Sequence, residues 1–160
     1  MAKMKTPKDT RELTWQELET EIQWRAKKKD KRFRLSGPWK KLVRVQDGFK
    51  VYAVNGKWVQ ANLSVIFGTG GNGLVHEFIP ADEVWINTHH YRDTPFNTCA
   101  CKNVKDERPV SRAFFDSTAL HEITECKAMK KGMPYWQAHH LADEAELRAG
   151  ILKDPYLEVE

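Results

Sequence analysis

The chain is 160 residues long, with 41% hydrophobic and 30% charged residues, and it includes six Trp and seven Phe. This length and apolar content suffice for a single ordinary core, so two large domains are excluded. The mean hydropathy is −0.65. No apolar run approaches the roughly 20 residues that a membrane-spanning helix needs, so we expect a soluble protein without a membrane partner.

The start of the chain is basic, but no apolar segment follows it, so it does not resemble a secretory signal. The three cysteines, Cys99, Cys101 and Cys126, lack the C-x-x-C spacing of a zinc knuckle or a redox pair. We therefore expect a cytoplasmic protein whose cysteines are free thiols.

Positive charge is concentrated near the N-terminus. Residues 1–50 hold 15 Lys and Arg against 7 Asp and Glu, whereas residues 51–160 hold 11 against 15. A basic segment of this kind attracts nucleic acid or an acidic protein, although a solvated helix end has the same composition. The candidate contact residues are Lys27, Lys28, Lys29, Lys31, Arg32 and Arg34.

The first predicted element is an amphipathic helix over about 15–29. Thr14 and Glu17 have the spacing of a capping box, and apolar residues recur at helical spacing after them. Ser36-Gly37-Pro38 then interrupts the pattern. We therefore divide the chain into a basic helix and linker, residues 1–40, and a second unit, residues 41–160.

Strand patterns follow from residue 41 to residue 86. Apolar runs that include Lys57-Trp58-Val59 flank Asn55-Gly56, a dipeptide typical of tight hairpin turns, so we predict a hairpin there. Further runs predict strands over 64–67, 74–78 and 84–87, in a small, mostly antiparallel sheet of four to six strands. The glycine-rich segment 68–73 lacks the Lys-Ser/Thr of a P-loop, so we interpret it as a flexible hairpin loop rather than a phosphate cradle.

Residues 87–110 form a polar stretch that we interpret as a long loop, a type of segment that is often functional. It contains His89, His90, Cys99 and Cys101, whose spacing matches no standard metal site.

Two helices are predicted after Ser111. Apolar residues recur at helical spacing over 112–131, and Gly132 provides a C-terminal stop. Pro134 suits the first turn of a second helix, over 134–149. The connection is so short that we expect an antiparallel helical hairpin.

The first of these helices carries His121-Glu122-Ile123-Thr124-Glu125. Residues four apart lie about 40° apart around a helix, so His121 and Glu125 share one face and Glu122 lies beside them. In H-E-x-x-H zinc hydrolases, two ligands one turn apart hold the metal, and the Glu between them takes a proton from the bound water. Zinc also accepts carboxylate oxygen, so Glu125 is a candidate second ligand and Glu122 a candidate catalytic base.

The second helix offers further ligands. At about 1.5 Å of rise per residue, His139 and Asp143 lie level with Glu125 and His121 across the hairpin, and Glu146 shares their face. We therefore predict a site for zinc, or another divalent metal, at His121, Glu125 and His139, with Asp143 or Glu146 as an additional ligand or as a partner of one. A solvated acidic face would have a similar composition. A di-iron site would need Glu-x-x-His pairs on two helices.

A longer pattern joins these elements. It runs through Tyr52-Ala53-Val54-Asn55-Gly56, Gly70-Gly71, Phe78-Ile79-Pro80, Glu83-Val84-Trp85-Ile86, His121-Glu122-x-x-Glu125, Met129, Gly132-Met133-x-Tyr135 and Ala138-His139-x-x-Ala142-x-x-x-Glu146. The pattern covers more than half of the chain. It resembles a group of small bacterial and phage proteins that are themselves similar to minimal zinc peptidases.

The resemblance implies a zincin-like α+β fold, a strand at 83–86 that edges the active cleft, and an origin in a phage or mobile element. It also implies a metal site at His121, Glu125 and His139, with Glu122 as general base and Glu146 nearby. We therefore predict a zinc-dependent hydrolase that cleaves peptide or amide bonds in a peptide or protein substrate. The alternative is a non-enzymatic interaction protein with a structural metal site, which binds nucleic acid or an acidic protein through its basic N-terminal region.

Overall fold

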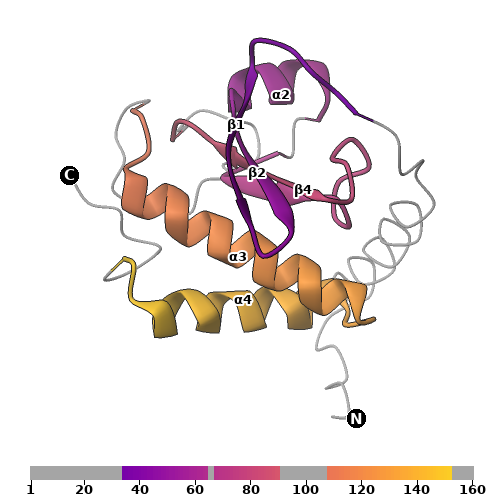
Figure 1. Ribbon diagram of the computed structural model, residues 1–160, viewed down its shortest axis with the longest axis vertical. Coiled ribbons are helices and arrows are strands. Elements are labelled where there is room, and N and C mark those ends of the chain that lie inside the picture. Colours follow the sequence, from indigo (N-terminus) through magenta and orange to yellow (C-terminus); the bar gives the residue numbers. More distant parts are fainter. Residues whose placement is uncertain (1–33, 65–66, 91–107, 153–160) are drawn as a thin grey trace, which may run out of the picture.

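The computed structural model describes residues 34–64, 67–90 and 108–152, which form an α+β fold around one mixed sheet (Figure 1). The strands are β1 (Lys40–Gln46), β2 (Phe49–Val54), β3 (Gly70–Asn72) and β4 (Glu83–Asn87). The helices are α2 (Gly56–Asn62), α3 (Arg112–Lys130) and α4 (Tyr135–Ala149). The helix predicted over 15–29 lies outside the described residues, as do Lys27, Lys28, Lys29, Lys31 and Arg32.

The four strands of the sheet have the order β1-β2-β4-β3. β1 pairs with β2 and β3 pairs with β4 in the antiparallel sense, whereas β2 and β4 are parallel. The sheet is therefore mixed, although two of its three pairings have the predicted antiparallel sense. Within the described residues, no helix is long and apolar enough to span a membrane.

Helices cover both faces of the sheet. Val84 and Ile86 of β4 pack in an apolar cluster with Ile123 of α3, whereas Trp85, between them, packs in a second cluster with Val59 of α2. This division follows from the alternation of side chains along a strand. α3 and α4 consequently lie along one face and α2 along the other, as Figure 1 shows.

The tight hairpin turn lies at Asp47-Gly48, and the prediction of a hairpin at Asn55-Gly56 is wrong. Asp47 and Gly48 have φ angles of 51° and 82°, as the two-residue turn between β1 and β2 requires. Asn55 has φ of −76°, and its side chain accepts a hydrogen bond from the backbone N–H of Trp58 at 3.2 Å. Asn favours both turns and helix caps, and here it caps α2, so the predicted strand at Lys57-Trp58-Val59 is a helix instead.

The glycine-rich segment 68–73 is not a flexible loop, because Gly70–Asn72 forms β3. A Cβ atom on Gly70 would lie 2.9 Å from Cγ2 of Thr118 on α3, so glycine permits close packing there. The predicted strand over 74–78 is also wrong, since these residues form turns in which Leu74 N donates to Asn72 Oδ1. Residues 65–66 of the strand predicted over 64–67 lie outside the described residues, and the strand over 84–87 is confirmed within β4.

A buried ion pair joins β1 to β4. Lys40 Nζ lies 2.5 Å from Glu83 Oε1, and both side chains are almost completely buried. Trp85 Nε1 donates a hydrogen bond to the same carboxylate at 3.0 Å. Leu35 and Trp39, from the segment assigned to the linker, pack in the apolar cluster around Trp85. The described end of that segment is thus part of the core.

Candidate metal centre

The helix predicted over 112–131 is confirmed as α3. Ser111 caps its start by accepting a hydrogen bond from the third residue of the helix, and Gly132, with φ of 97°, lets the chain turn after its end. His121, Glu122 and Glu125 are all buried on this helix, and Glu125 is only 2% exposed. Buried ionisable groups need charged or hydrogen-bonding partners, and α4 and β3 supply them.

The second predicted helix is confirmed as α4, which runs back along α3 (Figure 1). Ala138 and Ala142 are completely buried, and such small side chains let two helices approach closely. His139, Asp143 and Glu146 project from the same helix and reach side chains of α3. The hairpin therefore brings together all of the predicted ligands and their predicted partners.

Three donor atoms form a small triangle in the hairpin. His121 Nε2 lies 3.1 Å from Glu125 Oε2 and 3.2 Å from His139 Nδ1, and His139 Nδ1 lies 3.0 Å from Glu125 Oε2. Donor atoms around a tetrahedral zinc ion are about 3.3 Å apart, given bond lengths of about 2.0–2.1 Å. The spacing and chemistry of these residues are therefore compatible with a bound metal ion such as zinc.

A second set of contacts orients His121. Its Nδ1 lies 2.9 Å from Glu146 Oε2 and 3.3 Å from Asp143 Oδ1, and Ser117 Oγ donates to Glu146 Oε1 at 2.7 Å. A carboxylate that accepts the Nδ1–H of an imidazole leaves the Nε2 lone pair for a metal. Glu146 thus fits the role of a partner to a ligand, and Asp143, which also lies 3.6 Å from His139 Nε2, contacts both imidazoles.

Asn72 of β3 is a site residue that the sequence did not reveal. Its Nδ2 donates to Glu122 Oε2 at 3.1 Å and to Glu125 Oε1 at 3.0 Å, and the residue is completely buried. The only feature of the sequence that could have indicated this role was the single amide side chain among the glycines of segment 68–73. The interpretation of that segment as a loop concealed it, because only the pairing of β3 with β4 directs Asn72 toward α3.

The cluster is rich in negative charge, and this shifts the pKa values of its members. Burial alone would lower the pKa of His121, but hydrogen bonds to Asp143, Glu125 and Glu146 outweigh it and raise the pKa far above its usual value. Burial would raise the pKa of Glu125, but hydrogen bonds from His121 and His139 lower it. Burial and the charge of Glu125 raise the pKa of Glu122 to about 8. The cluster therefore favours a positive charge at its centre, which a proton or a divalent cation supplies.

The strand predicted to edge the cleft lies elsewhere than expected. β4, which contains the strand predicted to edge the cleft, lies between β2 and β3, so β3 is the edge strand next to the cluster. Arg34, a candidate for contact with nucleic acid or an acidic protein, lies within the described residues, and its guanidinium pairs with Asp82 at 3.1 Å. The cluster itself contains two overlapping groups of ligand-type side chains, His121, His139 and Asp143, and His121, Glu122 and Glu125.

Comparisons with protein-family models, with curated proteins and with solved structures find no match to this chain. The chemical interpretation of the cluster therefore depends on its own geometry.

Proposed function

We propose that this protein is a zinc-dependent hydrolase with a zincin-like fold, which cleaves peptide or amide bonds as its motifs suggest. The observation that supports this most directly is the triangle of His121, Glu125 and His139 donor atoms with the carboxylate of Glu122 held beside it by Asn72. A structural zinc site is closed by four ligands and has no use for such a carboxylate. The presence of Glu122 thus favours catalysis over a purely structural site.

In this proposal His121, Glu125 and His139 hold the ion. Bound zinc supplies Lewis acidity, which brings the pKa of a bound water close to neutrality. Glu146 accepts the Nδ1–H of His121 and so keeps Nε2 available as a ligand. Glu122, beside these ligands, would act as the general base that takes up a proton and as the acid that gives it to the leaving amine.

The substrate would lie along β3. This strand is at the edge of the described sheet, and an extended peptide binds such an edge by main-chain hydrogen bonds. A Cβ on Gly70 would lie 3.3 Å from Cγ of Glu122, so the strand runs directly against the proposed base. A peptide paired with β3 would therefore place its backbone amides near Glu122.

The Glu122→Gln variant tests the proposed role of the base. It keeps the size of the side chain and removes its ability to accept a proton, so we expect zinc to stay bound in near-stoichiometric amount while turnover falls by about 10²–10⁴-fold. Elemental analysis gives the zinc content, and a library of quenched fluorescent peptides gives turnover. His121→Ala and His139→Ala should both lose the zinc.

Glu144→Gln is the matched control, since Glu144 lies on α4 with an exposed side chain outside the cluster. Loss of zinc from Glu122→Gln would make Glu122 a ligand rather than a base. Purified native protein that neither contains zinc nor takes it up would overturn the proposal.

A further inference from the structure

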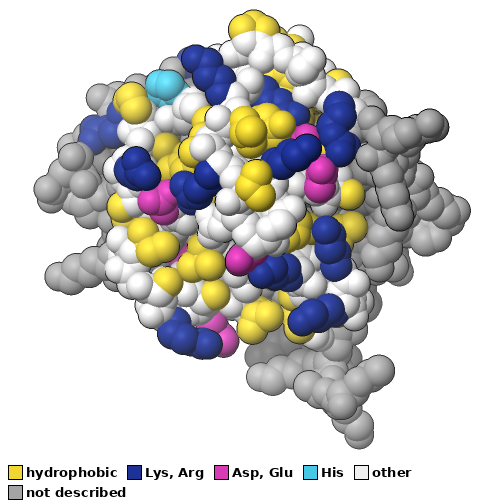
Figure 2. All heavy atoms as spheres, in the orientation of Figure 1, with side chains coloured by type: hydrophobic (Ala, Val, Ile, Leu, Met, Phe, Trp, Pro, Cys, Tyr) yellow, Lys and Arg dark blue, Asp and Glu magenta, His cyan; other side chains and the backbone are white. Residues whose placement is uncertain are grey.

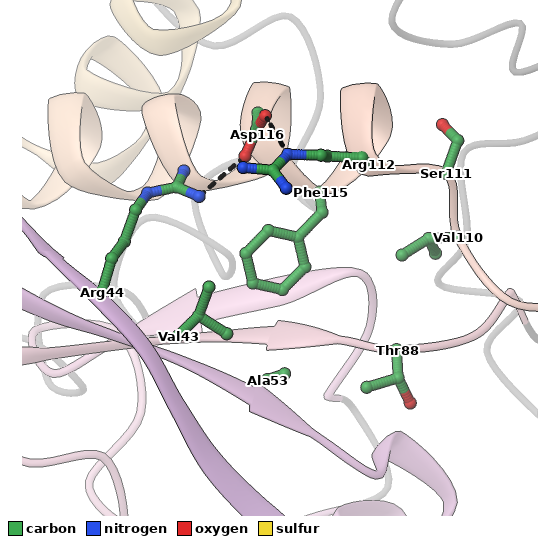
Figure 3. Close-up of a pocket in the computed structure, with 9 residues that line it drawn as sticks. All are labelled: Val43, Arg44, Ala53, Thr88, Val110, Ser111, Arg112, Phe115 and Asp116. Carbon is green, nitrogen blue, oxygen red and sulfur yellow. Dashed lines mark hydrogen bonds and ion pairs between the residues drawn. The ribbon is translucent and has the colours of Figure 1, made fainter.

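A cavity of about 410 Å³ lies between β1, β2 and the start of α3 (Figure 3). Its apolar wall includes Val43, Ala53, Val110 and Phe115, and none of its lining residues belongs to the metal cluster. Pockets of this size accommodate small organic ligands or single side chains. The cavity, which is open to solvent, is therefore a candidate binding site that the proposed hydrolase chemistry does not use.

A β-bulge shapes the wall of this cavity. The pairing of β1 with β2 shifts register between Leu42 and Arg44, which leaves Val43 as the extra residue. Neighbouring residues of a regular strand point to opposite faces, but Val43 and Arg44 both line the cavity. Bulges re-aim side chains in this way and often lie next to functional sites.

The rim of the cavity carries a net positive charge. Arg44 Nη1 lies 2.8 Å from Asp116 Oδ1, and Arg112 Nε lies 3.8 Å from Asp116 Oδ2, so two guanidinium groups share one carboxylate. Figure 3 shows the two guanidinium groups meeting at Asp116, above the ring of Phe115. Gln46 Oε1 accepts from Arg44 Nε at 2.9 Å and fixes that side chain further. Figure 2, which views the face formed by β1, shows Lys and Arg side chains more widely than Asp and Glu side chains there, among hydrophobic ones.

We propose that this cavity binds an amphipathic carboxylate. The apolar part would fill the space against Val43, Val110 and Phe115, and the carboxylate would bind Arg44 and Arg112. A guanidinium group matches the planar carboxylate with two parallel hydrogen bonds, and the single net positive charge of the rim matches one carboxylate. The C-terminal residue of a peptide and a free apolar acid both have this chemistry.

The test uses the full-length protein and two pairs of probes. The first pair is 4-phenylbutyrate and the neutral 4-phenylbutanol, and the second is acetyl-Gly-Leu with a free carboxylate and its C-terminal amide. Titrations followed by NMR chemical shifts should show saturable binding of a charged probe and at least about tenfold weaker binding of its neutral counterpart, since charge-assisted hydrogen bonds are lost. Binding of the peptide alone would identify the C-terminus as the ligand, and binding of 4-phenylbutyrate alone would identify a free acid.

Two substitutions should have opposite effects on binding of the charged probe. Arg44→Met should weaken binding of the charged probe about tenfold, whereas Asp116→Asn should strengthen it, because Asp116 competes with the ligand for both arginines. Lys131→Met, at an exposed position after α3, is the matched control and should change nothing. Equal binding of charged and neutral probes, or equal weakening by Arg44→Met and Asp116→Asn, would overturn the proposal. Loss of binding in His121→Ala would also overturn it, since the probe would then occupy the metal cluster.

Discussion

At the scale of single residues, Asn72 connects two carboxyl groups of the proposed site through one amide. One NH₂ group donates to both Glu122 and Glu125, whose carboxylates repel each other when both are ionised. Because the amide lies between them, it holds the proposed ligand Glu125 and the proposed base Glu122 in one arrangement. Its own Oδ1 accepts from Leu74 N, so the turn after β3 fixes the orientation of the amide.

Replacement of Asn72 should therefore weaken metal binding. In Asn72→Ala the two carboxylates lose their shared donor, and we expect zinc affinity to fall about 10–100-fold, as it does when partners of metal ligands are removed. Asn72→Asp should be worse, since it adds a third carboxylate. Competition with a chromogenic chelator measures the affinity. Asn62→Ala, on the exposed side of α2, is the control, and native-like affinity in Asn72→Ala would limit Asn72 to a structural role.

At the scale of elements, β3 is the strand whose sequence is most misleading. Its glycines are close to α3 and to the turn after the strand, because Cβ atoms on Gly70 and Gly71 would lie 2.9 Å from Thr118 Cγ2 and 2.5 Å from His76 Cδ2. Side-chain atoms added to a glycine stabilise the protein if the glycine lies in a flexible loop. They destabilise it if the glycine lies close to other atoms. A single substitution distinguishes the two cases.

Gly70→Ala should destabilise the protein by about 1–3 kcal/mol through overpacking, whereas the same change in a flexible loop stabilises a protein by about 0.4–1 kcal/mol. Urea unfolding measures the difference. Thr118→Ser removes the Cγ2 atom that the new methyl group would meet, so the double variant should recover part of the loss. A Gly70→Ala protein as stable as the native chain would contradict the packing described for β3.

The elements that sequence reasoning predicted are those with local signals. α3 and α4 have helical periodicity and glycine stops, and rise per residue alone placed His139 and Asp143 level with Glu125 and His121. The predictions were wrong where one residue type favours two kinds of structure. Asn55 caps a helix, although Asn is also typical of hairpin turns. Asn72 was missed because its role depends on strand pairing between residues distant in sequence, which no local pattern encodes.

At the scale of the whole molecule, charge is divided along the chain. The described residues gather acidic side chains in the hairpin of α3 and α4, whereas the basic run is concentrated before residue 34. α3 also contributes to two candidate sites, since its first turns line the cavity and its middle carries His121, Glu122 and Glu125 of the proposed metal site. The proposed metal chemistry and the alternative, recognition through the basic segment, can therefore be tested by separate substitutions.

The alternative function, recognition of nucleic acid by the basic segment, makes a prediction about salt. Affinity for a duplex oligonucleotide should fall steeply as the salt concentration rises. The full-length variant with Gln at positions 27, 28, 29, 31 and 32 should lose both affinity and salt dependence. Each lost phosphate contact makes the plot of log affinity against log salt concentration less steep by about 0.9. Fluorescence anisotropy measures both. Lys131→Gln is the control, because Lys131 is exposed after the end of α3 and lies outside the basic segment. Binding that is absent or insensitive to salt would contradict this alternative.

The buried pair of Lys40 and Glu83 has a consequence for the natural variation of this fold. Arg34 Nε lies 3.7 Å from the other oxygen of Glu83, but the Arg34 side chain is partly exposed. A Glu83 carboxylate left without the buried ammonium of Lys40 would therefore still destabilise the protein by several kcal/mol, whereas replacement of both charges by apolar groups is often neutral. Evolutionary drift at one of the two positions is therefore tolerated only with a matching change at the other. In any set of related chains, positions 40 and 83 should covary, either as an opposite-charge pair or as two apolar residues.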